Sequence, residues 1–175
     1  MLILQRPEIS QENLDKSRSS FTIEPLETGF GLTLGNTMRR ALLSRVPGVA
    51  VTGVKIDGVN HEFTSVPGVV EDVLDVLLNL KRLVLKVDDQ ESHTLTVKAK
   101  GPGEVNAAQI QCPAGVEVVN TDLKICTLSS DSTLDMEVSI EHGVGYRLAD
   151  RNKTSDSSFI PIDSMFSPVV KVSYA

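Results

Sequence analysis

The sequence predicts an α+β protein in which two helices interrupt a series of mostly antiparallel strands. Two segments repeat apolar residues at helical spacing, many short segments alternate or cluster apolar residues as strands do, and the helices do not alternate regularly with the strands. The chain has 175 residues, of which 41% are hydrophobic and 4% aromatic. This length is sufficient for one core or for two small cores that are joined closely.

The N-terminal elements are predicted to be a strand and a helix. Apolar and polar residues alternate over 20–25, as in a half-buried strand, and Pro25 ends the pairing because it has no backbone donor. A helix is predicted over 33–46, and Pro47 and Gly48 close it. The apolar residues of this helix recur three and four positions apart: Leu34, Met38, Ala41, Leu42 and Val46.

A hairpin and a second helix are predicted next. Residues 49–56 are expected to form a strand that turns at 57–58 and pairs with a short strand at 61–64. The second helix is expected to start from a cap at 64–65 and to end near Lys81. Its predicted core face contains the apolar residues Val70, Val73, Leu74, Leu77 and Leu80.

The remaining residues, 83–175, are predicted to be β-structure throughout, because apolar clusters alternate with turn-forming Asp, Gly, Asn and Ser. The predicted strands lie at 83–87, 95–100, 116–119, 125–128, 134–140 and 169–174. Charge changes sign along the chain: residues 1–56 carry about +2 and residues 57–175 about −8. This change suggests a boundary between two subdomains near residue 50.

Composition and charge argue against several functional classes. The net charge of −6 and the absence of a basic stripe in the sequence argue against direct nucleic-acid contact. No apolar run reaches the roughly 18 residues that a membrane-spanning helix needs, and no cleavable leader is recognisable, so we expect a cytoplasmic protein without membrane contact. Cys112 and Cys126 are isolated and the three histidines are scattered, which predicts buried thiols, no metal and no cofactor.

A glycine-containing loop permits an alternative interpretation. Gly29, Gly31 and Gly35 lie between a strand and a helix, as in a dinucleotide-binding loop, and Asp57 ends a later strand. That fingerprint needs a parallel βαβ unit, which this chain does not predict, so glycines that shape the start of a helix are favoured. No catalytic residue is predicted. Three carboxylates of the second helix are interpreted as a solvated surface that faces a partner: Glu71, Asp72 and Asp75.

The first predicted helix carries arginines on more than one side. Adjacent helical residues point about 100° apart, so Arg39 and Arg40 cannot share a face. Arg40 and Leu43 form a stripe opposite the one that contains Met38. A helix with two contact faces is covered by its own domain on one face and by another surface on the second, which predicts protein association.

The string LETGFGLTLGNTMRRALLS at 26–44 closely resembles the signature helix of the bacterial RNA polymerase alpha subunit family. The resemblance covers essentially the whole chain, and the opening residues are most similar to actinobacterial members. Further matching segments are IDGVNHEF at 56–63, GVVEDV at 68–73, LNLK at 78–81, KGPG at 100–103, Gly143, Gly145 and Tyr146, and Asp163 with FSPV at 166–169.

This resemblance implies an assembly scaffold. In this family the N-terminal domain comprises a dimerisation subdomain, here 1–50 completed by 169–175, and an inserted β-rich subdomain, here 51–168. The alpha homodimer recruits the beta subunit and then the beta-prime subunit of DNA-directed RNA polymerase. The chain would therefore serve a nucleotidyltransferase without supplying catalytic residues.

The family pattern also implies which residues meet each partner. The alpha–alpha interface would include Leu34, Met38 and Leu42. The beta contact would include Arg40 and Leu43, and the beta-prime contact would include Lys81 and Ile162. An Arg suits such an interface because its planar fork binds carboxylates and carbonyl groups. Val144 departs from the family, which commonly has an Arg between the two glycines of this loop, so a basic contact would be lost.

The strands and the long helix that complete the family's dimerisation subdomain, and its C-terminal DNA-binding domain, would follow Ala175. No direct DNA contact is therefore expected from these residues. Two alternatives stay open: a nucleotide-binding enzyme that uses the Gly29–Gly35 loop, and a shortened regulatory decoy that occupies beta without completing a dimer.

Overall fold

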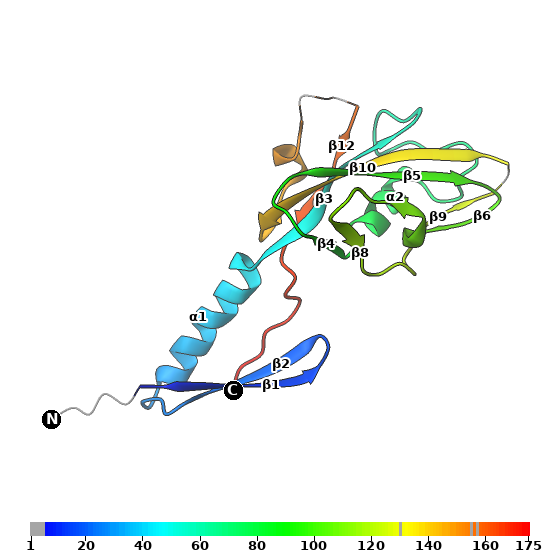
Figure 1. Ribbon diagram of the computed structural model, residues 1–175. Coiled ribbons are helices and arrows are strands. Elements are labelled where there is room, and N and C mark those ends of the chain that lie inside the picture. Colours follow the sequence, from blue (N-terminus) through cyan, green and yellow to red (C-terminus); the bar gives the residue numbers. More distant parts are fainter. Residues whose placement is uncertain (1–5, 130, 155, 157) are drawn as a thin grey trace. The chain divides into compact units, whose positions relative to one another are not determined.

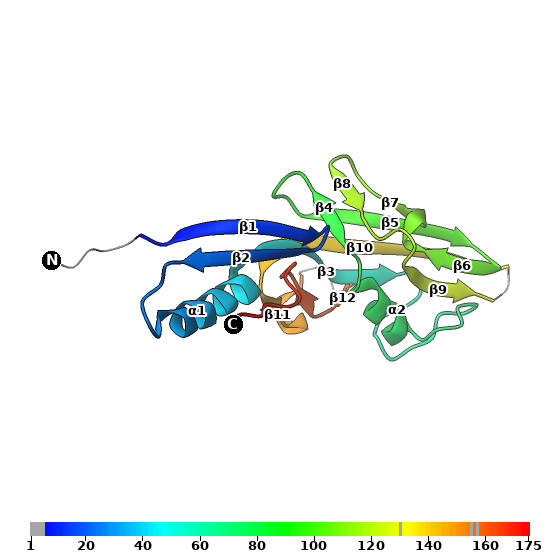
Figure 2. The same cartoon turned by 90° about the horizontal axis from the view of Figure 1, so that it is seen from below.

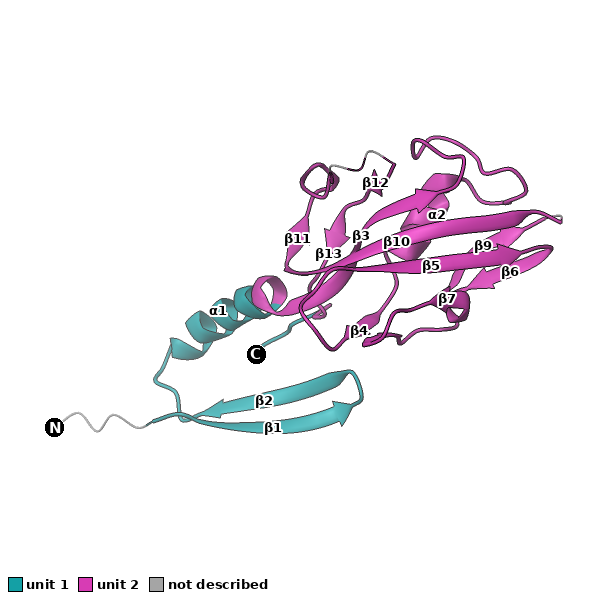
Figure 3. Cartoon of the chain, turned by 45° about the horizontal axis from the view of Figure 1, so that its top comes forward, with its two compact units in different colours: residues 1–42, 171–175 teal, residues 43–170 magenta. Residues whose placement is uncertain are grey.

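The structure, a computed structural model, describes residues 6–129, 131–154, 156 and 158–175 (Figure 1). Two α-helices and thirteen mostly short strands form the described part of the chain, which confirms the predicted α+β class. The chain folds as two compact units (Figure 3). Unit 1 comprises Met1–Leu42 and Lys171–Ala175, and unit 2 comprises Leu43–Val170.

Unit 1 contains an antiparallel hairpin and most of the first helix. Strand β1, Glu8–Asp15, pairs with β2, Arg18–Glu24, and helix α1 then covers Phe30–Arg45. The predicted strand at 20–25 is confirmed as β2. The sequence analysis missed β1 because only Ile9 and Leu14 are apolar in it, which is too few for a period-two pattern.

Unit 2 is built around a five-stranded antiparallel sheet with the order β12-β3-β10-β5-β7 (Figure 2). Its strands are β12 (Ile160–Pro161), β3 (Pro47–Ile56), β10 (Thr133–Val144), β5 (His93–Lys100) and β7 (Ile110–Gln111). The strand predicted at 134–140 is confirmed as part of β10, which buries every second residue over most of its length.

Three two-stranded antiparallel pairs complete unit 2. They are β4 (Leu85–Val87) with β8 (Val116–Val118), β6 (Gly103–Asn106) with β9 (Lys124–Leu128), and β11 (Tyr146–Arg147) with β13 (Ser164–Met165). Two short 3-10 turns lead from these pairs to the five-stranded sheet: η1 (Ala107–Gln109) lies between β6 and β7, and η2 (Ala149–Arg151) between β11 and β12. The strands predicted at 83–87, 95–100, 116–119 and 125–128 correspond to β4, β5, β8 and β9.

Two predicted strands and one predicted pairing are wrong. Strand β3 pairs with β10 and β12 and not with 61–64, which forms a turn. The turn residues at 57–58 favour a local hairpin, but β3 instead lies between β12 and β10 in the sheet. The apolar residues of β10, far along the chain, stabilise this pairing. Residues 169–174 form no strand in the described part of the chain, because no described segment pairs with them.

Helix α2, Val73–Leu80, is shorter than predicted and begins later. The backbone of the preceding residues bonds elsewhere: the Val70 N–H donates to the Thr127 carbonyl at 2.9 Å, and the Val73 N–H donates to the Thr64 carbonyl at 3.2 Å. Of the predicted core face, Val70 and Leu74 are exposed. The observed buried face has strict helical spacing and consists of Val73, Val76, Leu77 and Leu80.

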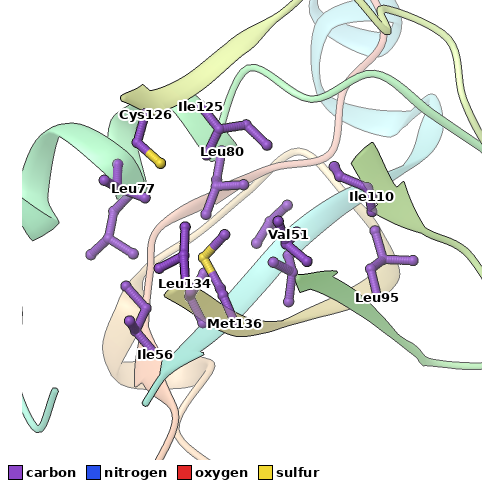
Figure 4. Close-up of a cluster of buried hydrophobic side chains, with 14 of the residues drawn as sticks. Val51, Ile56, Leu77, Leu80, Leu95, Ile110, Ile125, Cys126, Leu134 and Met136 are labelled. Carbon is purple, nitrogen blue, oxygen red and sulfur yellow. The ribbon is translucent and has the colours of Figure 1, made fainter. Parts of the chain in front are cut away.

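The core lies between the sheet and α2 within unit 2 (Figure 4). Two rows of side chains cross the three central strands and are almost fully buried: Leu95, Val138 and Val54 in one row, and Val97, Met136 and Ile56 in the other. Burial of each such side chain contributes roughly 1.5–3 kcal/mol. These rows fix the register of β3, β10 and β5, since a slip by one residue would turn each apolar side chain to the other face.

Candidate protein-interaction site

Helix α1 has sixteen residues, all of which the structure describes, and none of them is buried. The helix starts after Gly29, whose φ of +88° is strained for any residue with a side chain. Pro47, two residues after Arg45, stops the helix because it lacks a backbone N–H and restricts the residue before it. The sequence thus specifies a helix with clear ends whose apolar side chains stay at least partly accessible.

Three half-buried apolar side chains of α1 lie on one side of the helix. Leu34, Met38 and Leu42 recur every four residues and are all half-buried. Gly35 lies next to this row, and a Cβ at this position would overlap the ring of Tyr174, also in unit 1. The close approach of Tyr174 explains why a glycine suits the middle of this helix.

Arg40 is exposed and lies away from the Leu34 row. Leu43, three positions later and therefore about 60° around the helix axis, is half-buried. The structure therefore places the two residues of the predicted beta contact on a common side of α1. Arg39, about 100° away from Arg40, is exposed as well.

A second candidate surface surrounds Lys81, directly after α2. The Nζ atom of Lys81 lies 3.9 Å from Oδ2 of Asp163, and the backbone N–H of Ala149 donates to Oδ1 of the same carboxylate at 2.9 Å. The hydrogen bonds from Ala149 and then from Tyr146 lower the pKa of Asp163. The same bond to Asp163 raises the pKa of Tyr146. Asp163 is therefore a fixed anion that orients an ammonium and a phenol.

Ile162, predicted beside Lys81 as a contact residue, does not present its side chain at the surface. It is only 5% exposed and belongs to the core of unit 2. Its backbone N–H donates to the Thr52 carbonyl at 3.0 Å, next to the pairing of β12 with β3. Ile162 therefore anchors the segment between β12 and β13 on β3, and its neighbour Asp163 carries the accessible polar group.

Strands β11 and β13 display apolar side chains that the sequence analysis did not single out. Tyr146 lies directly opposite Met165 in the pair, and the two are 54% and 60% exposed. Val144 and Leu148, two positions before and after Tyr146, are also exposed. The alternation of these apolar residues with Gly145 and Arg147 was the signal that could have revealed them. Grouped exposed apolar side chains are typical of protein contact surfaces.

The ring of Phe166 packs against Gly143 of β10 and Arg147 of β11. The ring lies 2.8 Å from where a Cβ of Gly143 would be, and the Arg147 guanidinium carbon stands 4.7 Å from the ring centroid. Arg147 also donates from Nη1 to Oε2 of Glu141 at 2.7 Å. This close packing requires the glycine at 143 and holds Arg147 against β10.

Glu71 does not lie on the solvated outer side of α2, as the sequence predicted. Its carboxylate accepts hydrogen bonds from the backbone N–H of Thr127 at 2.6 Å and from the Thr127 hydroxyl at 2.9 Å. Lys124 Nζ lies 3.1 Å from Oε1. Burial alone would raise the pKa of Glu71, but the bonds from Thr127 and Lys124 lower it overall. Glu71 thus holds the segment before α2 onto β9. Asp72 and Asp75 are exposed.

The geometry around Gly29–Gly35 differs from that of a dinucleotide-binding loop. The strand before it, β2, belongs to an antiparallel hairpin and not to a parallel βαβ unit. Gly35 lies inside α1 against Tyr174 and not in the loop. The nucleotide-binding alternative therefore lacks the framework that would place a phosphate at the start of the helix.

Within the residues that the structure describes, no three His, Cys, Asp or Glu side chains gather as a metal site would require. Cys126 is buried and Cys112 half-buried, and neither is in a disulfide. Burial raises the pKa of the Cys126 thiol to about 11. No helix in the described part of the chain is long and apolar enough to span a membrane.

Comparison with known proteins is consistent with the resemblance seen in the sequence. Residues 54–167 match the family of the RNA polymerase Rpb3/RpoA insert domain. The chain is 53% identical to the DNA-directed RNA polymerase subunit alpha of Corynebacterium jeikeium, over 99% of this chain and 51% of that protein. It is also 53% identical to the subunits of the same name from Kineococcus radiotolerans and Nocardioides sp., over 99% of this chain and 52% of each. The chain thus spans about half the length of these relatives.

Proposed function

Since this chain belongs to the RNA polymerase Rpb3/RpoA insert-domain family, we propose that it is the assembly part of an alpha subunit. In this role it forms a homodimer and recruits the beta and beta-prime subunits of DNA-directed RNA polymerase in the cytoplasm. The names of its actinobacterial relatives support this proposal. The chain serves a nucleotidyltransferase and contributes no catalytic residue or cofactor of its own.

The exposure of helix α1 supports this proposal most directly. A sixteen-residue helix with no buried residue retains apolar side chains that water does not favour, and a partner surface would cover them. Leu34, Met38 and Leu42 form the proposed alpha–alpha side. Arg40 and Leu43 form the proposed side for beta.

The proposed beta-prime contact lies in unit 2 and combines Lys81 with Asp163. Asp163 takes the place of Ile162, because the Ile162 side chain is buried. The proposed subdomains are a dimerisation part, 1–50 with 169–175, and the inserted part, 51–168. The compact units of the fold divide the chain between Leu42 and Leu43, inside α1, and between Val170 and Lys171.

The proposal is tested with the Arg40→Ala variant. We expect it to weaken the complex with purified beta subunit by about 2–4 kcal/mol, the range of an arginine hot spot at an interface. Light-scattering chromatography of the chain alone and mixed with beta gives the stoichiometry, and a titration gives the affinity. The fold should be unaffected because Arg40 is exposed on α1.

Arg45→Ala is the matched control, since it removes the same kind of exposed side chain about 140° around the helix from Arg40 and about 160° from Leu43. It should bind beta as the unchanged chain does. Equal affinities of Arg40→Ala and the unchanged chain would refute the assignment of this side of α1 to beta. If neither the unchanged chain nor any variant binds beta, the scaffold function of this chain is refuted.

A further inference from the structure

The turn after α2 borders a polar hollow of about 520 Å³ in unit 2. This volume lies in the range of sites that accept small ligands or a few residues of a peptide. None of the residues that line it is among those proposed above for the dimer, beta and beta-prime contacts. It is lined by Glu71, Asn79, Arg82, Asn120, Asp122, Leu123 and Lys124.

Two asparagines make the walls of this hollow rigid. Asn79 on α2 donates from Nδ2 to the Ile125 carbonyl at 2.9 Å. Asn120 donates from Nδ2 to the Arg82 carbonyl at 3.0 Å and accepts at Oδ1 from the Val84 N–H at 2.9 Å. These bonds join α2, the turn after it and the loop before β9, so the hollow is formed before any ligand arrives and binding costs little ordering.

The charges around the hollow divide into paired and unpaired groups. The Nζ atom of Lys124 lies 3.1 Å from Oε1 of Glu71 and 3.8 Å from Oε1 of Glu104, so two carboxylates already compensate its charge. Among the described residues, the side chains of Arg82 and Asp122 form neither a hydrogen bond nor an ion pair. The Arg82 guanidinium is therefore the available cation of this hollow, and its five donors suit a carboxylate.

An exposed apolar surface adjoins Arg82. Arg82, in the turn after α2, and Val84 are both exposed on either side of the buried Leu83. Val119 lies next to Val84, because its N–H donates to the Val84 carbonyl at 2.9 Å. Val84 and Val119 are 52% and 59% exposed. An unpaired cation thus stands two residues from an apolar pair.

We propose that this surface binds an extended segment of a partner polypeptide that carries an acidic residue followed, two positions later, by an apolar residue. In an extended segment such residues share a face and lie about 6.6–7 Å apart, so both side chains can turn toward this surface together. The carboxylate pairs with the Arg82 guanidinium at the hollow, and the apolar side chain covers Val84 and Val119. Asp122 disfavours a second acidic residue.

Nuclear magnetic resonance of the isotope-labelled 175-residue chain tests this proposal with the blocked tripeptide acetyl-Glu-Ala-Val-amide, titrated through the millimolar range. We expect saturable shifts at the amides of Asn79, Val84, Val119 and Asn120. Acetyl-Gln-Ala-Val-amide and acetyl-Glu-Ala-Ser-amide each remove one feature and should bind more weakly. Sodium acetate supplies the carboxylate alone, and binding of acetate as strong as that of the tripeptide would overturn the peptide assignment.

Arg82→Gln should reduce the tripeptide affinity about fivefold, which is the upper end for an exposed ion pair. Arg151→Gln is the matched control: Arg151 is also exposed and in unit 2, and this change should leave the affinity as it was. Asp122→Asn should raise the affinity, so one variant gains binding and folding defects cannot mimic the pattern. Shifts without saturation, or equal losses in both Arg variants, would overturn the proposal. No polymerase subunit is present, so this outcome is independent of the assembly proposal.

Discussion

The two helices of this chain use their apolar residues in opposite ways. Helix α2 has eight residues and buries four of them, whereas α1 has sixteen and buries none. Short helices are marginal in water, so α2 depends on its packing against the core. The length of α1 and its well-defined ends permit a helix whose apolar residues remain accessible. Helical spacing alone therefore does not tell whether a helix packs on its own core or against a partner.

The largest expected effect separates the two helices by stability. Leu80→Ala in α2 removes a fully buried side chain and should lower the free energy of unfolding by about 2–5 kcal/mol. Met38→Ala in α1, where the side chain is only half-buried, should cost less than about 1 kcal/mol. Urea unfolding followed by circular dichroism measures both. Equal losses would mean that α1 contributes to the folded core as α2 does, and the contrast would fail.

Much of α2 and its surroundings could be predicted from the sequence, and the errors have a physical reason. The apolar spacing correctly predicted Val73, Leu77 and Leu80 as core residues. The start of α2 was wrong because the Val70 N–H and the Glu71 carboxylate bond to Thr127, which is more than fifty residues away. No local pattern contains such a long-range bond.

The candidate site was predictable to a different degree. The helical period alone predicts that Met38 and Arg40 lie on different sides of α1, and Met38 is half-buried whereas Arg40 is exposed. The family resemblance implied a beta-prime contact for Ile162, but β12 pairs with β3 and the Ile162 side chain lies in the core. The exposed pair of Tyr146 with Met165 depends on the pairing of β11 with β13, which only the fold reveals.

An intermediate effect concerns the segment before α2. Glu71→Gln should destabilise the chain by about 1.5–3 kcal/mol at pH 7, since it weakens the hydrogen bonds of Thr127 to a charged acceptor and the pair with Lys124. The folded state lowers the pKa of Glu71 below its ordinary value of 4.5. Its contribution is therefore fully present above about pH 4.5 and is lost as the pH falls through the lower, folded-state pKa.

Unfolding measured from pH 7 down to acid should thus show the unchanged chain and Glu71→Gln converging as the pH falls. Asp75→Asn is the control, because Asp75 is exposed on α2. If the free energies of unfolding of the unchanged chain and Glu71→Gln differ by the same amount at every pH, the negative charge of Glu71 does not hold this segment. The start of α2 would then depend on packing alone.

The smallest expected effect distinguishes two glycines of α1. Gly31 has no neighbouring atom within 4 Å of an added Cβ, so Gly31→Ala should stabilise the helix by up to about 1 kcal/mol through its higher helix propensity. Gly35→Ala should gain less or lose stability, because its Cβ would overlap the Tyr174 ring. Thermal unfolding compares the two variants, and the nuclear magnetic resonance signals of the Tyr174 ring report its displacement. Equal stabilisation by both changes, with an unmoved ring, would mean that Tyr174 does not cover α1 in solution. The side of α1 that contains Leu34 would then be as open as the side that contains Arg40, and both sides of the helix would be available to partners.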